Sequence, residues 1–151
     1  FASHFAPAMM MDALRVYRDN FKPSESFTEP YVMLGFNVCA AETLEEAEYL
    51  RSSSVMSFLN LRKGAPRRLP PPVPDLDQKL EPLDRAILAE MKSPVALGDK
   101  DMIAEGLADF IDQTGANELM LVCSMYDHDK RVRSFEITAE AAKSLNWTAA
   151  T

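Results

Sequence analysis

The stretch that decides the fold reads Tyr-Val-Met-Leu-Gly-Phe-Asn-Val-Cys-Ala and covers residues 31–40. Asn37 is the one strongly polar side chain that interrupts it. Nearly continuous apolar runs of this length are typical of strands buried on both faces, as in a parallel sheet under helices. We therefore predict an α/β fold in which parallel strands are covered by outer helices.

Helix and strand patterns alternate on both sides of this stretch. Helices are predicted over residues 8–20, 44–61, 82–91 and 99–114 and after Asp127, and further strands over 93–97 and 118–123. With a strand end in residues 1–6, these make four strand–helix units. Four units are half of a (β/α)8 barrel, which takes about 250 residues. The prediction is a partial TIM barrel, roughly its last four βα units, over residues 1–145, with a tail at 146–151. An open doubly wound sheet is the alternative, but no Gly-rich phosphate turn follows any strand.

The first seven residues, Phe-Ala-Ser-His-Phe-Ala-Pro, have the pattern of the last turn of a buried strand. Pro7 then opens a helix, where its missing N–H costs least. A chain seldom begins inside a buried strand, and no Met or signal-peptide pattern precedes this one. We expect the chain to be the downstream piece of a larger protein whose upstream piece holds part of the site.

Capping residues mark the predicted helix ends. Thr43 and Glu46 fit a capping box, in which the Glu side chain reaches back to the N-cap. Asp99 and Asp127 are placed as N-caps, and Gly115 provides a stop signal.

A proline-rich loop covers residues 64–75 and reads Gly-Ala-Pro-Arg-Arg-Leu-Pro-Pro-Pro-Val-Pro over 64–74. So many prolines exclude helix interior and central strand, so the segment should be extended, with polyproline II character. We predict a stiff loop that crosses the surface or the mouth of a site. The alternative is a motif for a peptide-binding domain, since Arg68, Pro71 and Pro74 fit the basic-x-x-Pro-x-x-Pro pattern.

Composition excludes several classes of function. The net charge of −7 argues against a nucleic-acid binder and against attraction to anionic membranes. No apolar run approaches the ~20 residues of a membrane span. Cys39 and Cys123 lie in apolar runs and are predicted to be buried free thiols in a reducing cytoplasm. His4 and His128 are the only histidines, which rules out a His-rich metal site, and no metal is expected.

Several segments together resemble the bacterial luciferase-like flavin monooxygenases. They are residues 1–7, 13–24 (Ala-Leu-Arg-Val-Tyr-Arg-Asp-Asn-Phe-Lys-Pro-Ser), 30–38, 41–47 (Ala-Glu-Thr-Leu-Glu-Glu-Ala), 115–120 (Gly-Ala-Asn-Glu-Leu-Met), and Tyr126-Asp127-His128 leading into Arg131 and Arg133. The resemblance runs from the fifth strand of such a barrel to its closing helix. It implies a TIM-barrel enzyme that uses reduced FMN, supplied by a reductase, and O2 to oxidise a small organic substrate. A deazaflavin is the alternative cofactor.

Family members take FMN phosphate contacts largely from a Gly-Ser-type loop just before the segment that matches Phe1. That loop and the first four strands are absent from this chain, so we expect the chain alone to bind FMN poorly and to be inactive.

Candidate site residues come from predicted strand ends, where barrel enzymes place their chemistry. His4 is the catalytic candidate, and Ser3, His4 and Asn37 are the candidates for cofactor contacts. The expected substrate pocket, which must be dry, consists of Phe5, Phe36, Met125 and Tyr126. Asp127 is predicted to be a helix cap rather than an acid, and His128 to be a solvated residue rather than part of the site. Gly98 and Asp99 stand at a helix N-terminus, but the carboxylate of Asp99 argues against an anion there.

An open half-barrel leaves a sheet face and two edges uncovered. A homodimer would cover them, and a fold-back of the proline loop and tail is the alternative. The second functional hypothesis is a non-catalytic α/β module that dimerises and binds a partner through its proline motif. The sequence does not identify the substrate.

Overall fold

The protein is described by a computed structural model that covers residues 7–91 and 93–145. The strand end predicted in residues 1–6 and the tail at 146–151 lie outside these ranges. In chain order the elements are the short 3-10 helix η1 (Pro7–Met9), α1 (Met10–Asp19), β1 (Met33–Ala40), α2 (Leu44–Arg62), α3 (Leu76–Lys79), α4 (Pro82–Ala89), β2 (Val95–Gly98), α5 (Lys100–Thr114), β3 (Glu118–Val122) and α6 (His128–Lys143). Every helix and strand predicted within the described ranges is present, and α3 is the one α-helix that was not predicted.

The three strands form one parallel sheet in the order β2-β1-β3. The parallel α/β prediction is confirmed. The strand order differs from that of a barrel, in which consecutive strands are neighbours and β2 would lie between β1 and β3. β2 is only four residues long and pairs with the second half of β1, Asn37–Ala40, while β3 pairs with Met33–Asn37. The long, doubly buried β1 is therefore the centre of the sheet, as in the open alternative.

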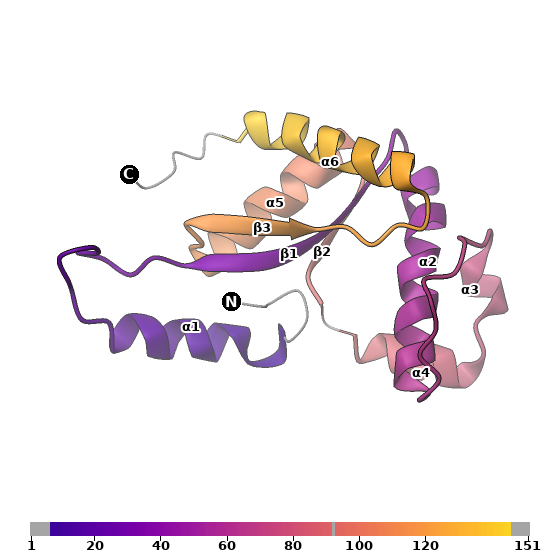
Figure 1. The fold of residues 1–151 in the computed structure, drawn as a ribbon, viewed down its shortest axis with the longest axis horizontal. Coiled ribbons are helices and arrows are strands. Elements are labelled where there is room, and N and C mark those ends of the chain that lie inside the picture. Colours follow the sequence, from indigo (N-terminus) through magenta and orange to yellow (C-terminus); the bar gives the residue numbers. More distant parts are fainter. Residues whose placement is uncertain (1–6, 92, 146–151) are drawn as a thin grey trace.

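The helices lie in two groups around this sheet. In Figure 1, α6 lies above the strands, α1 below them and α5 behind, and these helices enclose the core with the sheet. Phe36 of β1 stacks on Phe110 of α5 with 4.4 Å between ring centroids. Arg18 joins the end of α1 to the end of α5, because its guanidinium donates to the carbonyl oxygens of Thr114 and Gly115.

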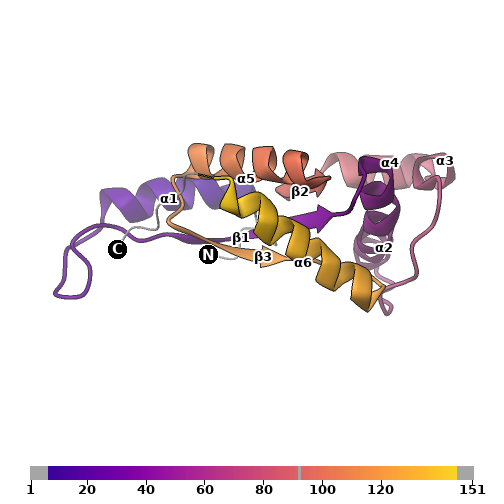
Figure 2. The ribbon, with the colours of Figure 1, turned by 90° about the horizontal axis from the view of Figure 1, so that it is seen from above.

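The second group consists of α2, α3 and α4. It lies at the carboxyl ends of the strands, at the far end of the molecule from the loop between α1 and β1 (Figures 1 and 2). The Asp84 carboxylate of α4 is buried and pairs with the ammonium group of Lys63, which holds α4 against the end of α2. This ion pair lowers the pKa of Asp84.

The predicted N-caps are confirmed, with one correction. The side chains of Thr43, Asp99 and Asp127 accept hydrogen bonds from the first-turn amides of α2, α5 and α6. The Glu46 carboxylate, however, accepts from the amide of Glu42 rather than that of Thr43, and its other oxygen is bound by the Lys130 ammonium. The capping box is therefore incomplete, and Glu46 joins α2 to α6 instead.

The proline-rich segment has neither helix nor strand over residues 65–73, as predicted. It runs along α2, where the amide of Val73 donates to Ser52 Oγ at 2.8 Å. The side chains of Arg68, Pro71 and Pro74, which carry the peptide-motif hypothesis, are exposed. That hypothesis stays a prediction.

Candidate functional site

One row of side chains crosses the sheet near its carboxyl edge. Asn37 of β1 lies in register with Val95 of β2 and Val122 of β3. Side chains in register on neighbouring parallel strands point to the same face of the sheet. These three residues line a cavity of about 170 Å³ on the face opposite to the Phe36–Phe110 stack.

Helix α2 supplies the facing wall of this cavity. Arg51, Ser54, Val55 and Phe58 all line it. They are spaced i, i+3, i+4 and i+7, so they form a single face of the helix. Because the Thr43 cap sets where α2 begins, it also sets which face meets the sheet. The rest of the lining consists of Val38, Cys39, Met91, Ser93 and Ser124.

A second cavity, of about 340 Å³, adjoins the first. The two share Ser54 and Ser124. The rest of its lining comes from α2, the proline segment, the residues after β3, and α6, and consists of Ser57, Leu69, Cys123, Met125 and Arg131. Among the described residues, neither cavity is lined by an aspartate or a glutamate.

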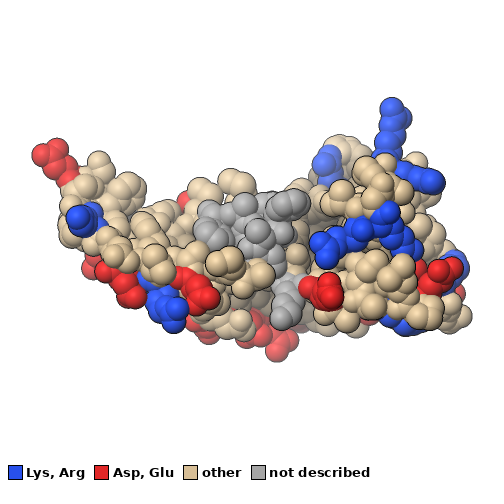
Figure 3. Space-filling model, turned by 90° about the horizontal axis from the view of Figure 1, so that it is seen from below, with Lys and Arg blue, Asp and Glu red and all other residues tan. Residues whose placement is uncertain are grey.

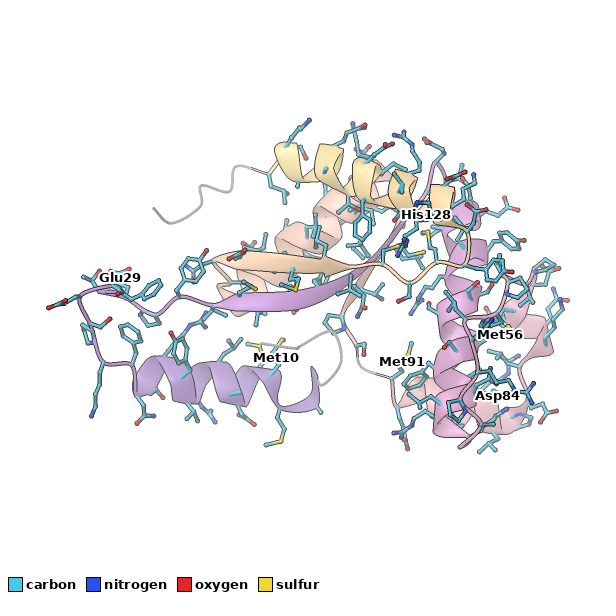
Figure 4. All side chains as sticks on the ribbon, viewed as in Figure 1. Met10, Glu29, Met56, Asp84, Met91 and His128 are labelled. Atoms are coloured by element: carbon cyan, nitrogen blue, oxygen red, sulfur yellow. The ribbon has the colours of Figure 1, made fainter. Side chains whose placement is uncertain are left out.

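A third cavity, of about 670 Å³, shares Arg51 and Val55 with the first and is rich in carboxylates. Its carboxylates come from Glu45, Glu48, Asp75 and Asp77. Met91 lines both this cavity and the first one, and Figure 4 shows it close to α2 and α4.

The structure brings two of the predicted site residues to these cavities. Asn37 lines the first one and donates from Nδ2 to the carbonyl oxygen of Pro94 at 3.1 Å. Met125 lines the second and is 5% exposed. Ser3, His4 and Phe5 lie outside the described residues, so their roles stay predictions.

Phe36 and Tyr126 do not lie where the pocket hypothesis expects them. Phe36 is in the core against Phe110, because alternate residues of a strand point to opposite faces and Asn37 occupies the cavity side. Tyr126 is 56% exposed and lines none of the three cavities.

Asp127, after β3, and Asp99, after β2, each stabilise the start of a helix. Asp127 caps α6, accepting from the amide of Lys130, and Asp99 caps α5 in the same way. His128, at the start of α6 (Figure 4), is exposed, and its Nδ1 lies 2.9 Å from Nη2 of Arg131.

Arg51 and Ser54 line the cavities but were not predicted as site residues. The signal was present, as polar residues on the same face of α2 as Val55 and Phe58.

Both cysteines are buried free thiols, as predicted. The pKa of Cys39 is raised to about 12, mainly by burial and in smaller part by the charge of a Cys123 thiolate, while the nearby Arg51 acts to lower it. Burial also raises the pKa of Cys123. Each folded-state pKa lies above the unfolded value of about 8.5, so both thiols stay neutral in the folded protein at neutral pH.

We predict that Cys39 and Cys123 react with a disulfide reagent such as DTNB at pH 8 much more slowly in the folded chain than in urea, because only thiolates react. By linkage, the neutral thiols contribute stability that is full below pH 8.5 and is lost as the pH rises toward about 12 for Cys39. Absorbance of the released thiolate measures the rate. Equal rates in the folded and unfolded chain would contradict the burial of these thiols.

The described residues contain no group of three or more His, Cys, Asp and Glu side chains placed to hold a metal ion. Among their helices, none combines the length and apolarity that crossing a membrane requires.

The fold and these cavities define an α/β protein with a parallel sheet and ligand-sized cavities at the carboxyl ends of its strands. The chain is 38% identical over 145 residues to a luciferase-like monooxygenase of Escherichia coli K12, and 40% identical over 144 residues to YvbT of Bacillus subtilis. These alignments cover 96% and 95% of the chain and 43% of each relative, so the chain spans less than half the length of the relatives it matches.

The crystal structure of apo-MsnO8 is similar in fold, with a TM-score of 0.82 and 29% identity over 99% of this chain and 45% of that one. No family model matches the sequence.

Proposed function

We propose that this chain is the C-terminal portion of a luciferase-like, flavin-dependent monooxygenase. The observation that carries the proposal is the position of the cavities, at the carboxyl ends of parallel strands, where α/β enzymes bind their ligands. The similarity to a protein named luciferase-like monooxygenase over 96% of the chain supports the reaction class. We also propose that the substrate is a small organic molecule, that the protein forms a homodimer and that it is located in the cytoplasm.

The lining of the first two cavities fits part of a flavin. Val55, Phe58, Val95 and Val122 offer apolar surface for a ring, and the hydroxyl group of Ser124 can donate a hydrogen bond to a ring or side-chain oxygen. Volumes of about 170 and 340 Å³ are at or below the lower end of the ~300–1,000 Å³ typical of ligand pockets. The fit is therefore that of a partial site.

Reduced flavin and O2 would supply the oxidation, in which one oxygen atom enters the substrate and the other leaves as water. The residues of this chain would provide the surroundings. Phe58, Val95 and Val122 would exclude water from the apolar side of the cavity, and Leu69 would do so from the proline segment. A deazaflavin would meet the same lining, and FMN is proposed because of the resemblance to flavin monooxygenases.

FMN binding tests this proposal. Quenching of flavin fluorescence is measured as protein is added, for the 151-residue chain and for the longer protein that contains it. We expect saturable quenching by the longer protein and affinity at least ~10-fold weaker for the chain alone, because a partial site loses several contacts worth about 1 kcal/mol each.

Two results would change the proposal. If neither protein quenches FMN, the flavin hypothesis is wrong, and the non-catalytic interaction module becomes the better hypothesis. A partner whose binding is lost in Pro71→Ala and Pro74→Ala would then support that module. If the chain alone binds FMN as tightly as the longer protein, the upstream segment is not needed for the flavin site.

A further inference from the structure

We propose that the serine-lined groove formed by the first two cavities binds an oxyanion, a phosphate, sulfonate or carboxylate group of a small molecule, between Arg51 and Arg131. This inference goes beyond the proposed function, because binding an oxyanion requires no flavin.

Neither of these two arginines is held by a carboxylate of the described residues. Arg15, Arg62, Lys63, Lys130 and Arg133 each lie within 4.0 Å of a carboxylate oxygen. In the part of the chain that the structure describes, Arg51 and Arg131 form no such ion pair, although the protein carries 23 acidic residues. Both line the groove instead.

The groove supplies the hydrogen-bond donors that an oxyanion needs. Ser124 lines both cavities, Ser93 lines the first, and Ser57 lines the second. Ser54 also lines both, but its hydroxyl donates to the carbonyl oxygen of Arg51. Arg131 uses one guanidinium nitrogen in its contact with His128, and its other N–H groups can donate elsewhere. A lining that holds guanidinium and hydroxyl donors and no carboxylate favours an anion over a cation.

Arg51 also lines the acidic third cavity. Four carboxylates line that cavity, and among the described residues none lines the groove. A small anion would therefore be repelled in the third cavity and attracted in the groove. This difference in charge would make binding in the groove selective for anions.

The surface around the groove favours anions too. Lys and Arg side chains gather at the end of the molecule formed by α2 to α4 (Figure 3). Arg67 and Arg68 are exposed and immediately precede Leu69, which lines the second cavity. Basic residues at the mouth of a site raise the local concentration of anions there, even in a protein whose net charge is negative.

The positive charges of Arg51 and Arg131 act on the cysteines near the carboxyl ends of β1 and β3. Arg51 acts to lower the pKa of Cys39, and Arg131 acts to lower the pKa of Cys123, in both cases against the larger effect of burial. A negative charge placed at the end of β1 or β3 would be stabilised in the same way.

The test titrates the 15N-labelled chain with inorganic phosphate at constant ionic strength and follows the amide signals of Ser54 and Ser124. We expect saturable shifts at both residues. Arg51→Gln and Arg131→Gln should each weaken binding about tenfold, because each removes a charged hydrogen bond. Arg15→Gln is the matched control, since it removes the same charge from α1, where Arg15 is paired with Asp12. It should leave the affinity unchanged.

Ser124→Ala provides a second variant if an arginine variant does not fold, as judged by its spectrum. It removes one donor shared by both cavities and should weaken phosphate binding severalfold. Shifts that do not saturate, or equal losses in Arg15→Gln and Arg51→Gln, would overturn the proposal.

Competition distinguishes the source of the oxyanion. FMN carries a phosphate, and riboflavin has the same ring without it. Displacement of inorganic phosphate by FMN but not by riboflavin would assign the groove to the flavin phosphate. Displacement by neither would assign it to the substrate or another small molecule. Both results support an oxyanion site, and saturable phosphate binding without any flavin binding by the longer protein would reject the monooxygenase while leaving this inference standing.

Discussion

Replacing Phe36 with alanine is expected to lower the free energy of unfolding by about 3–5 kcal/mol, the usual cost of deleting a buried phenylalanine. Phe36 is 2% exposed and stacks on Phe110 across the interface between β1 and α5. The substitution would leave a cavity at the centre of the sheet that its neighbours cannot fill. Urea denaturation followed by circular dichroism measures the change.

The control is Phe27→Ala, which removes the same side chain from a loop where it is 52% exposed. It should change the free energy of unfolding by less than about 1 kcal/mol. If Phe36→Ala left stability unchanged and instead altered ligand binding, the pocket role predicted for Phe36 would be right and its core position wrong.

Replacing Gly106 with valine is expected to destabilise the protein by about 1–3 kcal/mol or more, through overpacking. A Cβ atom at Gly106 would lie 2.9 Å from Cβ and 3.4 Å from Cα of Ala96. Ala96 is in β2 and has no side-chain rotamer to change, so α5 or the strand would have to shift. The glycine therefore allows α5 to approach the sheet closely.

A double-mutant cycle separates this contact from the helix propensity of valine. Ala96→Gly should recover part of the stability lost in Gly106→Val, with a coupling energy of about 1 kcal/mol or more. Additive effects of the two substitutions would show that Gly106 and Ala96 do not restrict each other. Chemical denaturation of the four proteins provides the comparison.

Local sequence signals predicted the elements well because their causes are local. The apolar run at 31–40 became β1 (Met33–Ala40), and the prolines at 64–74 excluded regular structure, as their fixed φ and missing N–H require. Asp99 and Asp127 cap their helices through amides two or three residues away. These contacts need no other part of the chain.

Predictions that required long-range partners were less accurate. Glu46 was assigned to a capping box, but Lys130, which is 84 residues away in the sequence, binds its carboxylate. Phe36 was predicted to line the pocket. The sequence could not place it in the core instead, because β1 is apolar on both faces and gives no sign of which face meets α5. The strand order β2-β1-β3 was not predicted either, since it depends on which edge of β1 each later strand pairs with.

The sequence by itself determined the helices other than α3, the N-caps of α2, α5 and α6, the parallel class of the sheet and the burial of both thiols. Only the tertiary structure decided the site. Arg51 and Arg131 are 80 positions apart and belong to helices whose order says nothing of their separation in space. They line adjoining cavities because α2 and α6 both pack at the carboxyl edge of one sheet, and that packing follows from the total burial of apolar surface rather than from any local pattern.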